Sequence, residues 1–452
     1  MTRLLVRDFV HPPLHNYLLH VWMKVFGFGQ LQARLMSLAF GSLAIVMMYL
    51  LARRLFHATA GLIAALLLAV SQIAVNHSQE GRTYTLTLFL VLCAANLFVR
   101  AVWERKVRLW WAFVGAVILM MYSHYYTVFV VAALFLYGWL FRKQRPVPAR
   151  QWAGGALVVF FAFVPWLLSG VLERAASATK LNAATQFMRV QWFTPVSSLN
   201  WFHNGKWAGI YPESPLWTFP VGWLLFALPV ALAVAPRRRE WERYLSPAAP
   251  REAAALLLLL ALLPMTLGIA LAGLLRIQFD VRYIAYTIGP YYVLAAYGLS
   301  CVRLSAVRGA WLAVLVLYSV AALRANYFVP YKGDYRGATA YVASAYRPGD
   351  CVCFTPGPVD EENVAYFWRV HQRERRDIQA HRLMELLKGP AGCRRVWLVW
   401  DQVWYRNPTR EHYRKAKAEM DKIYELEELN HFFKIDVHLY VPRPAPRSEE
   451  PR

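Results

Sequence analysis

The sequence predicts an all-α, multi-pass membrane bundle followed by a small extracytoplasmic α/β domain. Of the 452 residues, 58% are hydrophobic and only 17% are charged, whereas soluble domains usually carry about 25% charged residues. Long apolar runs are confined to residues 33–327, and residues 328–452 read like an ordinary soluble sequence. Because about 18 apolar residues in a helix can cross the hydrocarbon core, the first part is expected to span a membrane repeatedly.

The apolar runs predict about ten spans. A buried core helix is the alternative for any single run, but a long series of such runs leaves too little polar surface for a soluble domain. The two runs that meet at Ser123 and His124 are the least clearly separated. The expected spans cover residues 35–52, 59–76, 83–101, 109–123, 125–141, 152–171, 217–235, 253–274, 285–302 and 309–327.

The formal net charge of +23 could suggest a nucleic-acid partner, but its distribution argues against one. The cations gather in alternate short loops, whereas the intervening short loops hold only Arg82, Arg276 and Arg282. Since Lys and Arg mark cytoplasmic loops, this asymmetry predicts the orientation. The cytoplasmic cations are Arg53, Arg54, Arg105, Lys106, Arg108, Arg142, Lys143, Arg145, Arg150, Arg237, Arg238, Arg239, Arg243, Arg303 and Arg308.

This orientation places the N-terminus outside the cytoplasm, although no span or signal peptide precedes it in this sequence. We therefore expect an upstream first span to be missing. The segments expected outside are residues 1–34, 76–82, 123–124, 172–216, 275–284 and 328–452.

Four regions follow from this topology: an outer loop over 1–34, a transmembrane catalytic domain over 35–327, an extracytoplasmic domain over 328–443 and a disordered tail over 444–452. Residues 12–29 are apolar on one face and are expected to form a helix along the outer interface. The Trp-rich loop 172–216 suits an aromatic belt, a lid near a lipid substrate, or both.

The extracytoplasmic domain alternates helical and strand patterns, which predicts a partly parallel sheet. One disulfide among Cys351, Cys353 and Cys393 is an open alternative to three free thiols. Helices are expected over 334–346, 361–371, 380–388 and 409–424, and strands over 351–355, 395–400 and 432–441.

Polar residues gather on the predicted outer side, which is the main indication of function. Ionisable residues at span ends can also snorkel or form structural pairs, so any one of them is weak evidence. Together they form a candidate site. Its members are Asp8, His11, Glu80, Arg82, Tyr84, His124, Arg282, Lys332, Asp334 and Arg336.

Three short motifs carry most of these residues. Asp8 to Leu14 (DFVHPPL) holds two prolines that give a rigid start to the interface helix, although proline in a first helical turn is also ordinary. In Ser78 to Tyr84 (SQEGRTY), Glu80 and Tyr84 are four residues apart and are expected to share a helix face. Tyr122 to Tyr126 (YSHYY) is a polar break in which His124 is more often structural than catalytic.

The order of these motifs resembles the GT-C glycosyltransferases of the protein-mannosyltransferase-like family. Its bacterial members are called family 39 glycosyltransferases and are similar to the aminoarabinose transferases that modify lipid A. The resemblance covers nearly the whole chain. It rests on HPPL (11–14), RLMSLAFG (34–41), NHSQEGRTY (76–84), YSHYY (122–126), FDVRYIAYTIGP (279–290) and KGDYRGATAYV (332–342).

The resemblance implies a sugar donor on a polyprenyl phosphate and an active site that faces outward. The catalytic acidic residue of the family precedes HPPL and has no match here, so Asp8 is a poor stand-in for it. Glu80 matches a second acidic position that holds acceptor or metal. The catalytic candidates are thus Glu80 and Asp8; the donor-phosphate candidates are His11, Arg82, Tyr84, Arg282 and Tyr283; the other outer-face candidates are His124, Tyr125, Lys332, Asp334 and Arg336.

We therefore expect an inverting transfer of sugar to a lipid, glycan or protein acceptor at the cell membrane, with no nucleic-acid partner. A base near the acceptor hydroxyl and cations near the leaving phosphate are what this reaction needs. A divalent metal on Glu80, His11 or His124 would do similar work, but the ligand spacing does not demand one, and the cofactor is left open. The alternatives are a transporter or lipid flippase, and an inactive truncated fragment.

Overall fold

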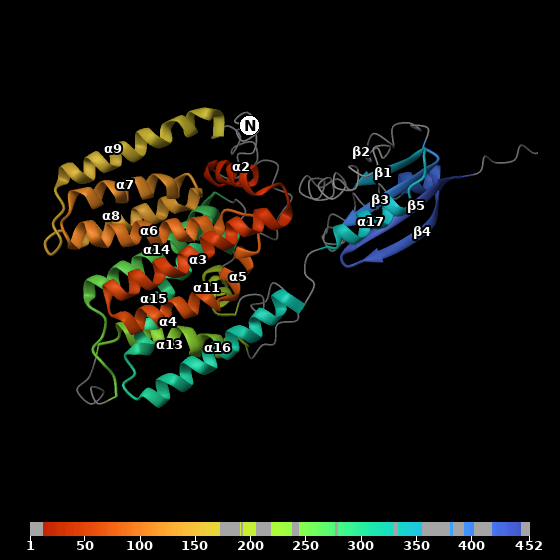
Figure 1. The fold of residues 1–452 in the computed structure, drawn as a ribbon. Coiled ribbons are helices and arrows are strands. Elements are labelled where there is room, and N and C mark those ends of the chain that lie inside the picture. The colour runs from red at the N-terminus through yellow and green to blue at the C-terminus, as the bar shows by residue number, and fades with distance from the viewer. Residues whose placement is uncertain are drawn as a thin grey trace, which may run out of the picture. The chain divides into compact units, whose positions relative to one another are not determined.

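The structure is a computed structural model that divides into two compact units, Met1–Tyr327 (unit 1) and Phe328–Arg452 (unit 2) (Figure 1). Each unit is described by itself. The residues described are 12–171, 190, 193–204, 218–236, 244–275, 279–328, 333–354, 380–382, 393–401 and 418–443.

Unit 1 is a bundle of helices, as the sequence predicts, and helices occupy all the predicted apolar runs. The α-helices are α2 (Leu14–Phe26), α3 (Gln30–Leu55), α4 (Ala58–Ala69), α5 (Gln72–Ser78), α6 (Tyr84–Trp103), α7 (Val107–Met121), α8 (Val128–Leu140), α9 (Ala149–Trp166), α11 (Thr194–Asn204), α12 (Thr218–Gly222), α13 (Leu228–Val234), α14 (Arg251–Leu274), α15 (Ile288–Ser300) and α16 (Ser305–Phe328). Short 3-10 or π-helical turns join them at η1 (Tyr125–Thr127), η2 (Leu167–Val171), η6 (Trp223–Ala227) and η8 (Val281–Thr287).

Among the described residues, five helices are long and apolar enough to cross a membrane, and a bent pair makes a sixth candidate. The bent pair is α4 with α5, which meet at an angle of 60° within the predicted span 59–76. That run is therefore not one straight helix. Ser71 lies at the break and caps α5, because its Oγ accepts from the amide of Ala74 at 3.5 Å.

The C-terminal part of the broken run carries the first site residues, Asn76 and His77, at the end of α5. A second irregular element, the 3-10 helix η8, precedes α15 inside the run predicted as 285–302. Both departures from straight spans lie where polar side chains gather, and they position the candidate site.

Helix α15 lies in the middle of the bundle, and all of its residues are buried (Figure 1). A helix that is apolar all round is expected to be enclosed by other helices. Its contact with α13 is closest at Gly298, where an added Cβ would lie 1.8 Å from the carbonyl oxygen of Pro229. Glycine is required there because backbone, which cannot move aside, fills the space.

We expect Gly298→Ala to destabilise unit 1 by about 3 kcal/mol, since the new methyl group forces α13 and α15 apart. The melting temperature of the purified protein in detergent checks this expectation. Gly115→Ala is the matched control, because Gly115 of α7 has open space around its Cα position. A loss of stability in the control equal to that in Gly298→Ala would contradict the packing argument.

Unit 2 contains a five-stranded mixed sheet of order β2-β1-β3-β5-β4 with helix α17 (Tyr335–Ala345) packed near β5 (Figure 1). Strand β1 pairs in parallel with β2 and β3, and β5 pairs antiparallel with β3 and β4. The predicted partly parallel sheet is therefore confirmed. The strands are β1 (Asp350–Phe354), β2 (Ala380–Arg382), β3 (Arg395–Asp401), β4 (Tyr424–Phe432) and β5 (Ile435–Pro442).

Two details of unit 2 differ from the prediction. Residues 380–382, expected to begin a helix, form β2 because they complete the parallel ladder beside β1. The segment 432–441, expected as one strand, contains the turn of a hairpin whose first strand, β4, lies over residues for which no strand was predicted. Phe432 pairs with Ile435, and Lys434 has a φ of 60°. Helix 361–371 and most of 409–424 lie outside the described residues.

A buried carboxylate ties the turn before β1 to the sheet. Asp350 accepts hydrogen bonds from Arg395 Nε at 2.9 Å and from Trp397 Nε1 at 3.0 Å. Burial would raise the pKa of Asp350, but the hydrogen bonds and charge of Arg395 lower it below the ordinary value. The carboxylate therefore stays ionised and holds the edge of β3.

Cys351 and Cys393 form a disulfide with their Cα atoms 5.6 Å apart, and Cys93, Cys301 and Cys353 are free. We expect mass spectrometry of denatured, alkylated protein to find three labelled cysteines before reduction and all five after it. In Cys351→Ser, reduction should reveal no further thiol. Five labels without reductant would exclude the disulfide.

Candidate functional site

The turn between α5 and α6 positions Glu80 and Arg82. Helix α5 ends at Ser78 and α6 begins at Tyr84, so Glu80 and Tyr84 do not share a helix, contrary to the sequence-based expectation. The turn packs on α3, where Ser37 Oγ donates to the Arg82 carbonyl at 3.4 Å. A Cβ at Gly81 would lie 3.2 Å from the side chain of Ala33, so the close approach to α3 favours glycine.

Glu80 is held by the two residues at the end of α5. Asn76 Nδ2 donates to Oε1 at 3.4 Å, and His77 Nδ1 lies 3.4 Å from Oε2. The carboxylate is largely enclosed, with 12% of the Glu80 side chain exposed. Both contacts are long for hydrogen bonds, and catalytic hydrogen bonds often shorten when substrate binds.

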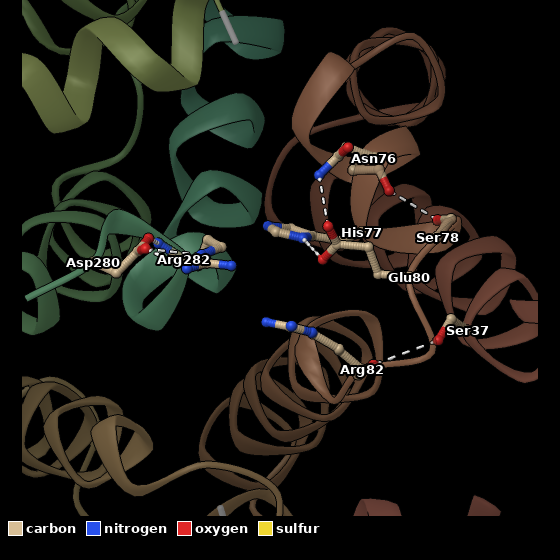
Figure 2. A network of polar contacts seen from close by, with 9 residues as sticks. Ser37, Asn76, His77, Ser78, Glu80, Arg82, Asp280 and Arg282 are labelled. Atoms are coloured by element: carbon tan, nitrogen blue, oxygen red, sulfur yellow. Dashed lines mark hydrogen bonds and ion pairs between the residues drawn. The ribbon is translucent and has the colours of Figure 1, made fainter. Parts of the chain in front are cut away.

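Arg82 and Arg282 extend from different segments toward the same space beside His77 and Glu80 (Figure 2). Arg82 is exposed, and within the described part of the chain no hydrogen bond or ion pair engages its guanidinium. Its position is thus suited to receive an anion from outside the protein.

Arg282 is instead fixed by Asp280 at the start of η8. The Asp280 Oδ1 accepts from the backbone amide of Arg282 at 2.9 Å, and Oδ2 accepts from Nε at 2.9 Å and Nη2 at 2.5 Å. Burial lowers the pKa of Arg282, but the hydrogen bonds and charge of Asp280 raise it above its ordinary value. The charge of Glu80 raises it further, so Glu80, Asp280 and Arg282 form one electrostatic cluster.

Aromatic rings line this cluster. The His77 and Tyr84 ring centroids are 4.6 Å apart, and the His124 ring lies 6.2 Å from Tyr84 and 5.9 Å from Tyr283. Burial, followed by the charges of Asp280 and Tyr84, raises the pKa of Tyr283 to about 12. Tyr283 is therefore a neutral hydroxyl near pH 7 and can donate a hydrogen bond to an anion.

The side chains of His124 and Tyr125 each accept a hydrogen bond within unit 1. His124 Nδ1 accepts from the amide of Tyr126 at 3.3 Å and caps η1. The hydroxyl of Tyr125 accepts from Trp166 Nε1 at 3.2 Å. His124 contacts the aromatic rings at the cluster, whereas the described contact of Tyr125 is directed to α9.

The remaining predicted residues lie elsewhere. Asp8, His11 and Lys332 are outside the described residues. Asp334 and Arg336 belong to unit 2, where Asp334 caps α17 by accepting from the amide of Gly337 at 2.8 Å. Their membership of the site remains a prediction.

The structure adds Asn76, His77 and Asp280 to the candidate site. Each is close in sequence to a predicted member, since Asn76 and His77 precede Glu80 and Asp280 precedes Arg282. For Asn76 and His77 the available sequence signal was their position about one helical turn before Glu80. Among the described residues, no group of three or more His, Cys, Asp or Glu side chains could hold a metal ion.

Two solved structures are similar to this chain at low sequence identity. ArnT from Cupriavidus metallidurans in the apo state is 16% identical, with a TM-score of 0.44, 95% of this chain covered and 88% of that one. The archaeal oligosaccharyltransferase AglB from Archaeoglobus fulgidus, in complex with an inhibitory peptide and a dolichol-phosphate, is 13% identical, with a TM-score of 0.43, 92% of this chain covered and 64% of that one.

No curated protein matches the chain at a significant level. The model of one protein family does match, over residues 10–168, and its description is dolichyl-phosphate-mannose-protein mannosyltransferase. This segment contains the motifs around Glu80 and His124 that the sequence resemblance rests on. The match confirms the resemblance to the protein-mannosyltransferase-like family over residues 10–168, and the motifs at 279–290 and 332–342 lie outside it.

Proposed function

We infer that this protein is a membrane glycosyltransferase that moves a sugar from a polyprenyl-phosphate donor to a hydroxyl of a lipid, glycan or protein acceptor. The observation that carries this function is the convergence of Glu80, Arg82 and Arg282 on one space (Figure 2). The matched family description supports the donor class, because it names a dolichyl-phosphate sugar.

The chemistry of the cluster suits this transfer. The acceptor oxygen attacks the anomeric carbon, the bond from that carbon to the phosphate oxygen breaks, and the acceptor proton passes to a carboxylate. Of the described carboxylates in the cluster, Glu80 is the proposed proton acceptor, because Asp280 is bound to the guanidinium of Arg282. Arg82 and Arg282 stabilise the negative charge that develops on the departing polyprenyl phosphate.

Tyr84 and Tyr283 complete the donor-phosphate site in this proposal, since Tyr84 packs against His77 and both tyrosines interact electrostatically with Arg282. Asp8 and His11 are assigned to the same site from the family resemblance alone. The acceptor is proposed only as a class: a lipid, a glycan or a protein. Asp8 of the N-terminal segment is the second candidate for the base.

The reaction is assigned to the outer face of the cell membrane. Glu80, Arg82 and Arg282 lie in segments that the charge asymmetry predicts to be outside the cytoplasm. The Cys351–Cys393 disulfide supports an oxidising compartment for unit 2.

The test uses the full chain in detergent with a panel of polyprenyl-phosphate sugars labelled in the sugar. We expect release of free polyprenyl phosphate together with transfer of label to an extract of membrane lipids, glycans or protein. A heat-denatured sample measures spontaneous donor hydrolysis. Absence of release with every donor, from protein that is folded by its melting curve, would reject the function.

A further inference from the structure

We propose that His77 is a positioning residue that orients the Glu80 carboxylate for sugar transfer, and this role rests on the function proposed above. His77 is three residues before Glu80 and lies outside the set of residues predicted from the sequence. Its Nδ1 is 3.4 Å from Glu80 Oε2, and only 4% of its side chain is exposed.

The imidazole ring is fixed by its surroundings. Tyr84 packs against it with ring centroids 4.6 Å apart, and Trp201 of α11 meets it edge-on at 6.1 Å. Since rings from two other helices enclose it, the His77 side chain cannot turn away from Glu80 without repacking. The contact to the carboxylate is therefore a built feature of this site.

The chemistry of the pair decides which nitrogen carries the hydrogen. An ionised carboxylate only accepts hydrogen bonds, so Nδ1 of His77 must be the donor. In the neutral imidazole, Nε2 is then an acceptor and requires a donor of its own. A donor to Nε2 would stabilise the tautomer in which Nδ1 carries the hydrogen and donates it to Glu80.

Nε2 of His77 is buried and has no hydrogen-bond partner among the described residues. The hydroxyl oxygen of Thr85, on α6, is in the same condition. Both residues line one small cavity between α5, α6 and the segment from η8 to α15. The cavity is just large enough for one water, and these two groups are polar atoms that such a water could reach.

A single water in this cavity would donate to Nε2 of His77 and meet the hydroxyl of Thr85. Figure 2 shows the His77 ring between Glu80 and the segment that carries Asp280 and Arg282. One ring nitrogen faces Glu80 and the other faces away from it. A purely space-filling residue would not need such a site, because an aromatic hydrocarbon ring leaves no polar atom unpaired. The histidine is explained by the carboxylate that it orients.

A double-mutant cycle on transfer separates positioning from packing. We expect His77→Phe to lower kcat by about 10- to 100-fold, with little change in the KM for donor, because the carboxylate is misplaced. In the Glu80→Gln background the same change should have almost no further effect. His77→Asn should restore most of the rate, since its amide nitrogen occupies the place of Nδ1.

The matched control is Ser78→Ala, because among the described residues the adjacent Ser78 bonds only to the carbonyl of Ala74 in its own helix, at 2.8 Å. It should keep the wild-type kcat. Thr85→Val, which removes the hydroxyl at the cavity with little change of shape, should lower kcat in the same direction as His77→Phe but less. Equal losses in His77→Asn and His77→Phe, or additive effects with Glu80→Gln, would overturn the positioning role.

A second cycle of His77→Phe, Glu80→Ala and their double variant reports on the contact without turnover, because alanine at position 80 removes the acceptor that glutamine would keep. If His77 and Glu80 interact, the shifts in melting temperature of the single variants should not add up in the double variant. Additive shifts would overturn the proposal even in a preparation without measurable transfer. An inactive wild type rejects the function, whereas an inactive Glu80→Gln with a fully active His77→Phe rejects only the role of His77.

Discussion

Glu80→Gln is expected to lower kcat for sugar transfer by about 10²- to 10⁴-fold, the usual contribution of a general base. The carboxamide keeps the size of the side chain and can still accept a hydrogen bond from His77 or Asn76, but it cannot take up the acceptor proton. The rate of polyprenyl phosphate release under saturating donor and acceptor measures this effect.

The control for Glu80 is Glu104→Gln, at the other end of α6. Glu104 forms exposed ion pairs with Arg100 and Lys106 and lies on the predicted cytoplasmic side, so its removal should leave transfer unchanged. If Glu80 instead holds the acceptor, Glu80→Gln will raise the acceptor KM and spare kcat. An unchanged rate and KM in Glu80→Gln would remove this residue from the reaction.

The helical bundle was predictable because apolar length is a strong signal, but the breaks within it were not. Apart from Thr59 the run 59–76 is apolar up to Val70, and at the bend Ser71 caps α5, a role that hydropathy does not detect. In unit 2, the segment FFKID lacks the glycine or asparagine that usually marks a hairpin. Lys434 adopts the positive φ instead, so the predicted strand 432–441 ran through the turn, and no element was predicted over 425–431, where β4 lies.

The sequence indicated candidate residues for the site but not the contacts between them. Glu80, Arg82 and Arg282 stand out because charged residues interrupt apolar sequence at the predicted outer ends of spans. Periodicity assigns a residue to an element, yet it does not say which elements meet. For that reason the fixing of Arg282 by Asp280 and the enclosure of Glu80 by Asn76 and His77 emerged only from the structure.

Arg282→Ala is expected to lower kcat by about 10²- to 10³-fold, as loss of one preorganised charge-stabilising group does. Asp280 already holds the guanidinium in place, so no reorganisation is needed when charge develops on the leaving phosphate. Arg282→Lys should not restore the rate, because an ammonium group cannot reproduce the planar fork that bonds both Asp280 and phosphate. Steady-state kinetics with a saturating donor measure both variants.

Arg82→Ala is expected to change KM, whereas Arg282→Ala is expected to change kcat. Arg82 is exposed, and no carboxylate of the described residues constrains it, so it is expected to bind the donor phosphate equally in the ground state and the transition state. Loss of such uniform binding raises KM and spares kcat. Arg142→Ala is the control, since Arg142 lies in a predicted cytoplasmic loop and bonds the carbonyl of Trp139 at 2.9 Å. If Arg282→Ala raised only KM while Arg82→Ala lowered kcat, the charge that acts in the transition state would be the exposed one, and the preorganisation by Asp280 would have no catalytic role.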